Sequence, residues 1–232
     1  MTTYAITLID NVPAITTPQN QVLLIDTGSP SSFSETGEIE ISGQKYHVPT
    51  ILHGKVTATY LKNAMHSNVI CGLVGMDIIS KGIYEFDYQN HVLKIFALED
   101  NLFSLGGEQI DLSYVAGIPI LPIYVGTTSV VQKFILDTGA KLSYAIPEIC
   151  RDLQNVGVDL DFNPFMGENL QVNKHSDFVY KVGSKFIQHI IHENARVTST
   201  VRQFASAGIL GYHFMKNQKI VLNPISKQLI IF

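Results

Sequence analysis

The sequence predicts an all-β protein made of two duplicated lobes, each a small β-barrel-like unit with a few short helices. One observation is the tripeptide Asp-Thr-Gly, which occurs at 26–28 and again at 137–139, each time after a run of apolar residues. A second is an ungapped match between residues 72–96 and 208–232, in which two glycines and a final Leu-x-Ile-Phe recur. A third is the abundance of short segments rich in Ile, Val, Phe and Tyr, which favour strands. Together these observations indicate an internal duplication of a mainly β unit.

The strand and helix signals follow one another in a similar order in both halves of the chain. In the first half, we expect strands at 4–9, 22–25, 38–41, 45–48, 83–86 and 92–96. In the second half, we expect strands at 118–125, 133–136, 178–182, 186–191, 220–222 and 228–232. Short helices are expected at 59–65, 76–80, 147–156 and 212–216, the third beginning at Pro147 and ending before Gly157. A break in the pattern near 98–109 predicts a first lobe of residues 1–105 and a second of residues 106–232.

The second half is longer than the first at one place. The matched segments are offset by 136 positions, whereas the two aspartates, Asp26 and Asp137, are offset by 111. The second half therefore carries 25 extra residues between its Asp-Thr-Gly and its later glycine. No motif in this excess assigns it a role.

The two aspartates are candidates for acid–base chemistry. A carboxylate at the end of a buried strand is costly unless it has a chemical role, although two unrelated structural turns would also produce the pattern. Two carboxyl groups within hydrogen-bonding distance share one proton, because ionising both is unfavourable. One then acts as a base toward water while the other acts as an acid, and this chemistry requires no cofactor and no metal.

Each Asp-Thr-Gly is followed much later by two apolar residues and a glycine, Leu73-Val74-Gly75 in one half and Ile209-Leu210-Gly211 in the other. This doubled pattern resembles the bilobal pepsin-like aspartic peptidases, with lobes short enough to be similar to retroviral protease (retropepsin) subunits. The resemblance implies a pepsin-like fold and an aspartic endopeptidase whose catalytic residues are Asp26 and Asp137. It also implies a peptide or protein substrate and a monomer with pseudo-twofold symmetry.

The resemblance extends to the residues around the two aspartates. It implies that Thr27 and Thr138 lock the two loops together across the pseudo-twofold axis. Gly28 and Gly139 would allow tight turns that bring backbone N–H groups to the carboxylates. The later glycines, Gly75 and Gly211, would complete the core loops behind them.

The residue after each tripeptide differs, being Ser29 in the first half and Ala140 in the second. A hydroxyl donor stabilises a carboxylate, so its absence beside Asp137 predicts a higher proton affinity there. We therefore expect a pH optimum less acidic than that of a secreted digestive enzyme.

Residues 39–48 alternate in polarity around Ser42-Gly43-Gln44 and predict a β-hairpin. The resemblance implies a flap over the substrate, with Gly43 in its turn and Tyr46 as the counterpart of the pepsin flap tyrosine. An ordinary surface hairpin explains the pattern equally well. Only 49 positions separate Asp26 from Gly75, and a reduced flap would leave a wide, slow or selective site.

Bulk properties exclude several classes of partner. Charged residues make up 16% of the chain and the net charge is −4, so we expect neither a nucleic acid nor a membrane as partner. The N-terminal residues have no secretory pattern, and we expect a cytoplasmic, bacterial protein. Cys71 and Cys150 have no metal-type spacing and are expected to be buried and inert, while His189 and His192 should face opposite sides of a strand.

Two other functions compete with catalysis. The chief alternative is a non-catalytic peptide-binding protein that retains the same fold, and a weaker one is a purely structural protein. Both Asp-Thr-Gly motifs are intact, whereas a decayed site would most simply have lost one of them. The sequence therefore favours the enzyme.

Overall fold

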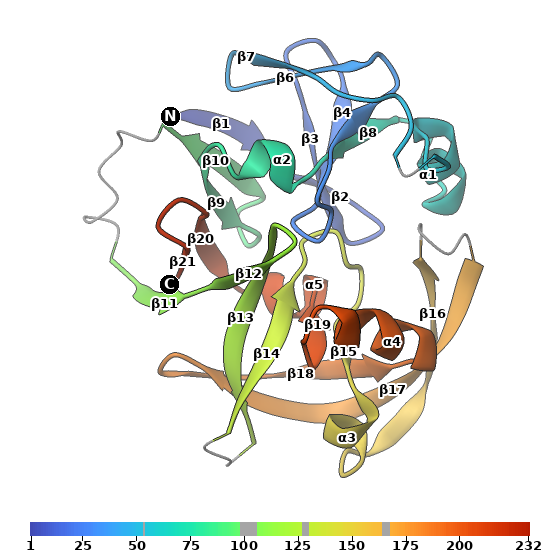
Figure 1. Cartoon of the computed structure of the whole chain (residues 1–232), viewed down its shortest axis with the longest axis vertical. Coiled ribbons are helices and arrows are strands. Elements are labelled where there is room, and N and C mark those ends of the chain that lie inside the picture. The colour runs from blue at the N-terminus through green and yellow to red at the C-terminus, as the bar shows by residue number, and fades with distance from the viewer. Residues whose placement is uncertain (53, 98–105, 127–129, 164–167) are drawn as a thin grey trace.

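The computed structural model of this chain describes residues 1–232 except 53, 98–105, 127–129 and 164–167. Two lobes lie one above the other in Figure 1, and one sheet beside them takes strands from both halves of the chain. The boundary expected between residues 105 and 106 falls at the edge of a segment outside the described residues.

The first lobe is built on a five-stranded sheet in the order β2-β3-β4-β8-β5. These strands are β2 (Thr7–Ile9), β3 (Val12–Thr16), β4 (Val22–Ile25), β8 (Ile70–Val74) and β5 (Phe33–Ser34). The hairpin of β6 (Glu38–Ile41) and β7 (Gln44–His47) forms a separate two-stranded sheet. The lobe also contains helices α1 (Ala58–Ala64) and α2 (Met76–Ile79). Thr57 caps the start of helix α1, because its side chain accepts a hydrogen bond from the Tyr60 amide.

The second lobe is built on an eight-stranded sheet in the order β12-β13-β14-β19-β15-β18-β17-β16. The strands are β12 (Ser113–Val115), β13 (Ile118–Val125), β14 (Val131–Leu136), β15 (Tyr144–Ala145), β16 (Asn155–Asn163), β17 (Glu168–Val182), β18 (Lys185–Glu193) and β19 (Gly208–Leu210). Its helices are α3 (Pro147–Cys150), α4 (Ala195–Gln203) and α5 (Tyr212–Met215). Strands β16 and β17 pair as a long antiparallel hairpin that rises toward the first lobe (Figure 1).

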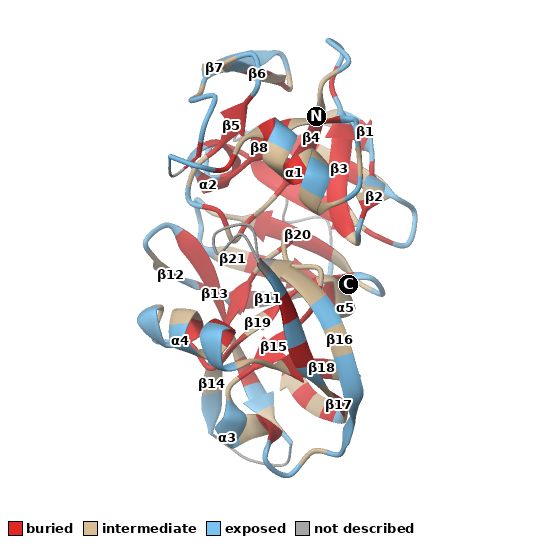
Figure 2. Cartoon of the chain, turned by 90° about the vertical axis from the view of Figure 1, so that its right-hand side faces the viewer, coloured by how far each residue is buried: buried red, intermediate tan, exposed pale blue. Residues whose placement is uncertain are grey.

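The shared sheet has six strands in the order β1-β10-β9-β20-β21-β11. Its first three strands, β1 (Thr2–Ala5), β10 (Val92–Phe96) and β9 (Ile83–Asp87), come from the first half. The other three, β20 (Lys219–Asn223), β21 (Gln228–Ile231) and β11 (Glu108–Asp111), come from the second. The halves meet where β9 pairs with β20, and buried residues of this sheet join the largest hydrophobic core cluster with residues of both lobes (Figure 2).

The structure corrects the expected elements in several places. The helix expected at 147–156 ends at Cys150, and residues from Asn155 onward continue as β16. The strand expected at 4–9 is divided between β1 and β2, and helix α4 was not expected. The other strands that were not expected are β3, β5, β8, β11, β12, β15 and β19. Isolated apolar runs are ambiguous between strand, helix and loop until their partners are known, which accounts for the missed strands.

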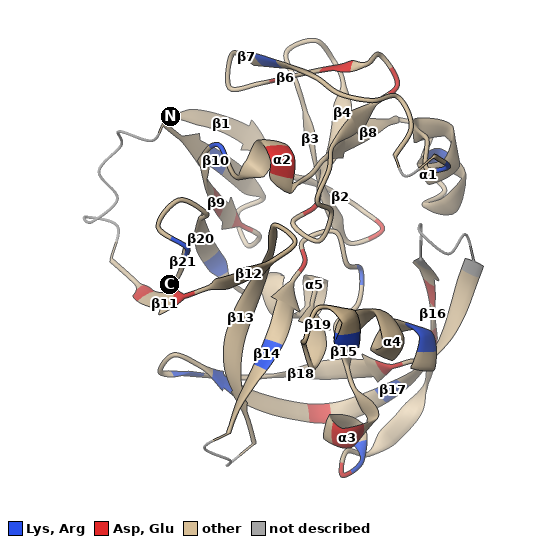
Figure 3. Ribbon diagram, viewed as in Figure 1, with Lys and Arg blue, Asp and Glu red and all other residues tan. Residues whose placement is uncertain are grey.

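The charged residues lie on many elements of both lobes, and Figure 3 shows lysines and arginines interspersed with acidic residues. None of the helices in the described part of the chain has the length and apolarity needed to cross a membrane.

Candidate active site

The two Asp-Thr-Gly loops begin where strands β4 and β14 end. Each strand lies parallel to a second one, β8 or β19, so each loop emerges between two buried strands. The Asp26 amide donates to the Val74 carbonyl at 3.0 Å, and the Asp137 amide donates to the Leu210 carbonyl at 3.0 Å. The same backbone bond therefore fixes both aspartates at matching positions in the two lobes.

Thr27 and Thr138 connect the two loops through four buried hydrogen bonds. The Thr27 amide donates to Oγ1 of Thr138 at 3.0 Å, and the Thr138 amide donates to Oγ1 of Thr27 at 2.9 Å. Each hydroxyl in turn donates across the interface at 2.7 Å, Thr27 to the Leu136 carbonyl and Thr138 to the Ile25 carbonyl. The loops are thus held together by reciprocal bonds related by pseudo-twofold symmetry.

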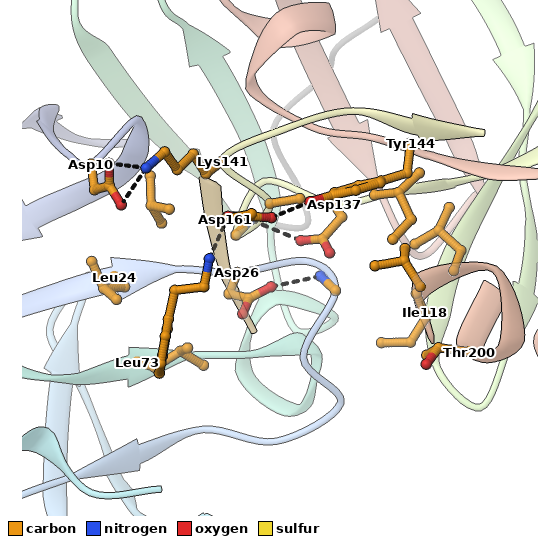
Figure 4. A pocket seen from close by; sticks show the side chains of 18 of the residues that line it. Asp10, Leu24, Asp26, Leu73, Ile118, Asp137, Lys141, Tyr144, Asp161 and Thr200 are labelled. Carbon is orange, nitrogen blue, oxygen red and sulfur yellow. Dashed lines mark hydrogen bonds and ion pairs between the residues drawn. The ribbon is translucent and has the colours of Figure 1, made fainter. Parts of the chain in front are cut away.

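The carboxyl groups of Asp26 and Asp137 lie next to each other at the centre of the site (Figure 4), close enough to interact through a hydrogen bond. Oδ1 of Asp26 accepts from the amides of Gly28 at 2.8 Å and Ser29 at 3.0 Å, and Oδ1 of Asp137 accepts from the Gly139 amide at 2.8 Å. A Cβ atom on Gly28 would lie 2.3 Å from Cγ of Asp137, and one on Gly139 would lie 2.2 Å from Cγ of Asp26. Each glycine is therefore required by the aspartate of the opposite lobe.

Burial raises the pKa of both carboxyl groups, and it does so unequally. The pKa of Asp137 lies well above its ordinary value because the group is buried and because the negative charge of Asp26 is adjacent. The pKa of Asp26 is raised by burial but lowered by its hydrogen bonds to Asp137, Gly28 and Ser29. The pair accordingly retains one proton over a broad pH range, with Asp137 as the stronger proton acceptor.

The proposed cause of this asymmetry was wrong, although its direction agrees. The Ser29 hydroxyl donates to the Ser31 carbonyl at 2.8 Å, and it is the Ser29 amide that bonds to Asp26. A serine hydroxyl at the position of Ala140 would therefore not be expected to bond to Asp137, and the presence of alanine there does not explain the raised pKa. Burial and the neighbouring carboxylate raise the pKa instead.

Gly75 and Gly211 lie against the backbone of the Asp-Thr-Gly loops. A Cβ atom on Gly75 would lie 2.6 Å from the Ser31 carbonyl oxygen, and one on Gly211 would lie 2.5 Å from the Ala140 carbonyl oxygen. Side chains are therefore excluded at both positions.

Two serines that sequence analysis missed support these glycines. The Ser32 hydroxyl accepts from the Gly75 amide at 2.8 Å, and the Ser143 hydroxyl accepts from the Gly211 amide at 3.0 Å. The serines are 111 positions apart, the same offset that separates the aspartates, and this offset could have identified them.

A cavity of about 410 Å³ lies over the carboxyl pair and is bounded by both lobes. Helix α1 contributes to its wall from the first lobe, and helix α4 contributes from the second. The apolar residues that line it include Val12, Leu24, Leu61, Met65, Leu73, Ile118, Ile135, Leu170, Val197, Phe204 and Ile209. The carboxyl pair is thus accessible from a largely apolar cleft.

No family model matches this sequence, and no curated protein matches it. The structure is similar to a solved structure of an aspartic proteinase from Irpex lacteus, with a TM-score of 0.50. The similarity covers 99% of this chain and 96% of that chain, at 10% sequence identity. The chain has the pepsin-like fold. The fold class expected from the sequence is therefore confirmed, and at this identity the likeness concerns the fold alone.

Within this pepsin-like fold, the hairpin of β6 and β7 does not reach the cavity. Neither Gly43 nor Tyr46 lines it. The Ser42 amide bonds to the Tyr4 hydroxyl at 2.8 Å, and Nζ of Lys81 lies 4.7 Å from the centre of the Tyr46 ring. The hairpin was expected and is present, but its packing gives the flap role no support.

The hairpin of β16 and β17 does reach the cavity of this pepsin-like fold, from the second lobe. Asp161 and Phe162 at the upper part of β16 line it, and the Phe162 ring lies 5.7 Å from the Tyr60 ring of helix α1. The Tyr144 hydroxyl donates to Asp161, whose pKa is raised by burial (Figure 4). The longer second lobe therefore bounds the cleft with an element that the sequence had not assigned.

An ion pair also crosses between the lobes at the edge of the cavity. Nζ of Lys141 lies 2.8 Å from a carboxylate oxygen of Asp10, and both residues line the cavity (Figure 4). Asp10 occupies the turn between β2 and β3. The contact is distant in sequence, and no local pattern indicates it.

His189 and His192, expected to face opposite sides of a strand, both lie in β18 near a third histidine. Their ring centres lie 6.0 Å and 5.5 Å, respectively, from the ring of His213. Strand β18 loses its regular alternation of burial here, opposite a bulge in β17 between His175 and Phe178. Burial lowers the pKa of His189 and of His213 to about 4, so both rings are neutral at neutral pH.

Proposed function

We propose that this protein is an aspartic endopeptidase that hydrolyses peptide bonds in the cleft between its lobes. The observation that carries the proposal is the adjacent pair of Asp26 and Asp137, half-buried, interacting with each other and open to a cavity. Two carboxyl groups that share one proton can supply a base and an acid to the same substrate bond. The pepsin-like fold supports this function at the level of architecture.

In the proposed mechanism, Asp137 holds the shared proton and Asp26 is ionised, because the pKa of Asp137 is the more strongly raised. Asp26 removes a proton from a water molecule as that water attacks the peptide carbonyl carbon. Asp137 gives its proton to the carbonyl oxygen, and a tetrahedral intermediate forms. Asp26 then gives the proton it took from water to the amide nitrogen while Asp137 takes a proton back from a hydroxyl of the intermediate, and the C–N bond breaks to release an amine and a carboxylic acid.

The substrate in this proposal is a peptide or an unfolded protein segment that lies along the cleft. Its apolar side chains contact Leu61 and Met65 on one side, and Val197 and Phe204 on the other. The chain acts as a monomer, since residues 1–105 and 106–232 each supply one aspartate. It acts in the cytoplasm, and the chemistry of the carboxyl pair needs no cofactor. We also infer that these two lobes arose by duplication of one unit.

The decisive experiment is digestion of a peptide library by the wild-type protein, by Asp26→Asn and by Asp137→Asn. Either substitution keeps the side-chain shape but prevents that residue from exchanging the shared proton. We expect the wild type to cleave the library and each variant to lose cleavage at least about a thousandfold. A pepstatin-type inhibitor should block the wild type.

A matched control is Asp152→Asn, which removes an exposed carboxyl group of the second lobe. It should leave cleavage unchanged. The losses in the other two variants would then be specific to Asp26 and Asp137, and not a result of any Asp→Asn substitution or of the preparation. Binding of peptides without cleavage by the wild type would overturn the proposal and favour the non-catalytic peptide-binding protein.

A further inference from the structure

Three side chains with metal-binding atoms converge in the second lobe, away from the cleft. Cys150 lies at the end of helix α3, His175 lies in β17, and Glu193 ends β18. One ligand atom from each residue lies within 4.8 Å of the other two. None of the three lines the cavity over Asp26 and Asp137.

His175 gives a second, independent indication of a ligand. Its side chain is 8% exposed, and neither ring nitrogen makes a hydrogen bond in the structure. A buried imidazole without hydrogen bonds is costly, because both nitrogens lose contact with water. Nε2 lies 3.4 Å from Oε2 of Glu193, a distance suited to two ligands of the same ion.

The other two residues complete a mixed donor set. Cys150 is 1% exposed, and the contact of its Sγ atom with the Ala145 carbonyl oxygen is 3.8 Å long. The Glu193 side chain is 24% exposed and leaves one side of the cluster open to solvent. Because the thiol is enclosed and away from the cleft, the cluster is better suited to holding an ion than to attacking a substrate.

We propose that Cys150, His175 and Glu193 bind one transition-metal ion, which the thiolate, imidazole and carboxylate donors identify as zinc. Thiolate and imidazole together favour zinc over magnesium or calcium, which prefer oxygen ligands. The thiolate and the carboxylate together neutralise Zn²⁺, so the buried site carries no net charge. The thiol proton passes to solvent on binding, and water supplies the fourth ligand on the Glu193 side.

The geometry requires only a modest closure around the ion. Zinc bonds of about 2.0–2.3 Å place tetrahedral ligand atoms roughly 3.3–3.8 Å apart. The pair formed by His175 and Glu193 already meets this spacing at 3.4 Å. The Cys150 side chain would move toward them by about 1 Å or less, since no ligand atoms are more than 4.8 Å apart.

The site lies at the base of the long hairpin. His175 pairs with Asn155 at the start of β16, whereas Asp161 and Phe162 at the other end of that strand line the cleft. At about 3.3 Å per residue, the two ends are roughly 20 Å apart, so the ion takes no part in the cleft chemistry. It would instead tie α3, β17 and β18 together beneath the hairpin, a role that does not depend on the proposed peptidase activity.

The test is metal binding by the reduced full-length protein after treatment with a chelator. We expect one zinc per chain by mass spectrometry of the metal, and a rise in melting temperature of about 5 °C with excess zinc. Cobalt should bind at the same site and give the near-ultraviolet absorption band of a thiolate ligand. These measurements require no enzymatic activity.

Three variants decide whether the ion is held by this cluster. Cys150→Ala should abolish the thiolate band, while the matched control Cys71→Ala should retain it, because Cys71 lies in β8 of the first lobe. Glu193→Gln keeps the side-chain size and should weaken zinc binding by about tenfold or more, even if Cys150→Ala fails to fold. No thiolate band in the wild type, or equal zinc binding by Glu193→Gln, would overturn the proposal.

Discussion

Each hydroxyl of Thr27 and Thr138 accepts one hydrogen bond and donates another across the boundary between the lobes. Both residues are almost fully buried, so water cannot replace a lost bond. Removing one hydroxyl therefore leaves a backbone amide and a backbone carbonyl of the opposite lobe without partners. The reciprocal pair makes the position of each aspartate depend on both lobes.

We predict that Thr27→Val lowers the free energy of unfolding by about 2–4 kcal/mol, because it leaves the Thr138 amide and the Leu136 carbonyl unsatisfied. Urea unfolding followed by circular dichroism measures the change. Thr198→Val is the matched control, since the Thr198 hydroxyl is buried without a hydrogen bond and its loss should be neutral or stabilising. Equal losses in the two variants would contradict the role of the threonine pair.

We predict that Asp137→Asn stabilises the protein, and more so at about pH 8 than at about pH 4. The pKa of Asp137 is raised on folding, so its contribution is favourable at low pH and is lost as the pH rises through the folded pKa. Each unit by which folding raises the pKa of Asp137 lowers the free energy of unfolding at high pH by about 1.4 kcal/mol, and the variant avoids this loss. Urea unfolding at both pH values tests this, with Asp152→Asn expected to show no such gain.

The rate of peptide cleavage should depend on pH through the same pair. Activity requires one shared proton, so the rate falls at low pH when Asp26 also becomes protonated, and at high pH when Asp137 loses its proton. Because the pKa of Asp137 is well above its ordinary value, we expect activity to extend toward neutral pH. A profile of kcat/KM against pH, confined to strongly acid solution, would contradict this expectation.

At the residue scale, the sequence predicted those site residues that belong to a recurring local motif. Asp26, Asp137 and the glycines could be identified because the tripeptide and its spacing recur. The direction of the Ser29 hydroxyl and the contact of Asp10 with Lys141 could not, because both depend on how loops pack in three dimensions.

At the scale of elements, two hairpins differ in their relation to the cleft. The hairpin of β6 and β7 packs against Tyr4 and Lys81, while the hairpin of β16 and β17 brings Asp161 and Phe162 to the cavity. The Phe162 ring also contacts Tyr60 of helix α1 across the cleft. The second lobe therefore bounds the cleft with a hairpin whose Phe162 faces helix α1 of the first lobe.

We predict that Phe162→Ala raises KM for peptides by about tenfold with a smaller effect on kcat, because it removes apolar contact area in the cleft. Tyr46→Ala is the matched aromatic control from the other hairpin and should leave KM unchanged, since Tyr46 does not line the cavity. Steady-state kinetics on one peptide substrate measures both. A larger effect of Tyr46→Ala would restore the first hairpin as the flap.

Helix α4 carries local sequence signals at its start and on its buried face. Helix α4 is preceded by Asn194, which caps its amides, and Val197 and Val201 have helical spacing on its buried face. Strand β17 was harder to predict, because its first half is polar and only Leu170 and Val172 alternate toward the core. Such a strand is stabilised mainly by its pairing with β16 and β18, which sequence alone does not reveal.

At the scale of the whole molecule, the six-stranded sheet joins the two halves. Strand β9 pairs with β20 from Lys219 opposite Asp87 to Leu222 opposite Tyr84. The buried Glu85 carboxylate contacts the ammonium groups of Lys94 at 2.7 Å and Lys219 at 3.5 Å, one from each half. Backbone pairing, ion pairs and a common core therefore span the boundary between the lobes.

We predict that the protein unfolds in a single thermal transition in which both halves melt together. The shared sheet and the threonine pair stabilise one half only while the other is folded. Differential scanning calorimetry should give a calorimetric enthalpy equal to the van't Hoff enthalpy. Two resolved transitions would show that the lobes are independent.

Gly28 and Gly139 make the two halves of the chain depend on each other. Each glycine leaves room for a carboxyl group that belongs to the other half, so the two tripeptides cannot drift apart one at a time. A tolerated change at either glycine would need a simultaneous change in the opposite aspartate. A requirement for the carboxyl pair would therefore constrain both tripeptides together, while the rest of each half is free to differ.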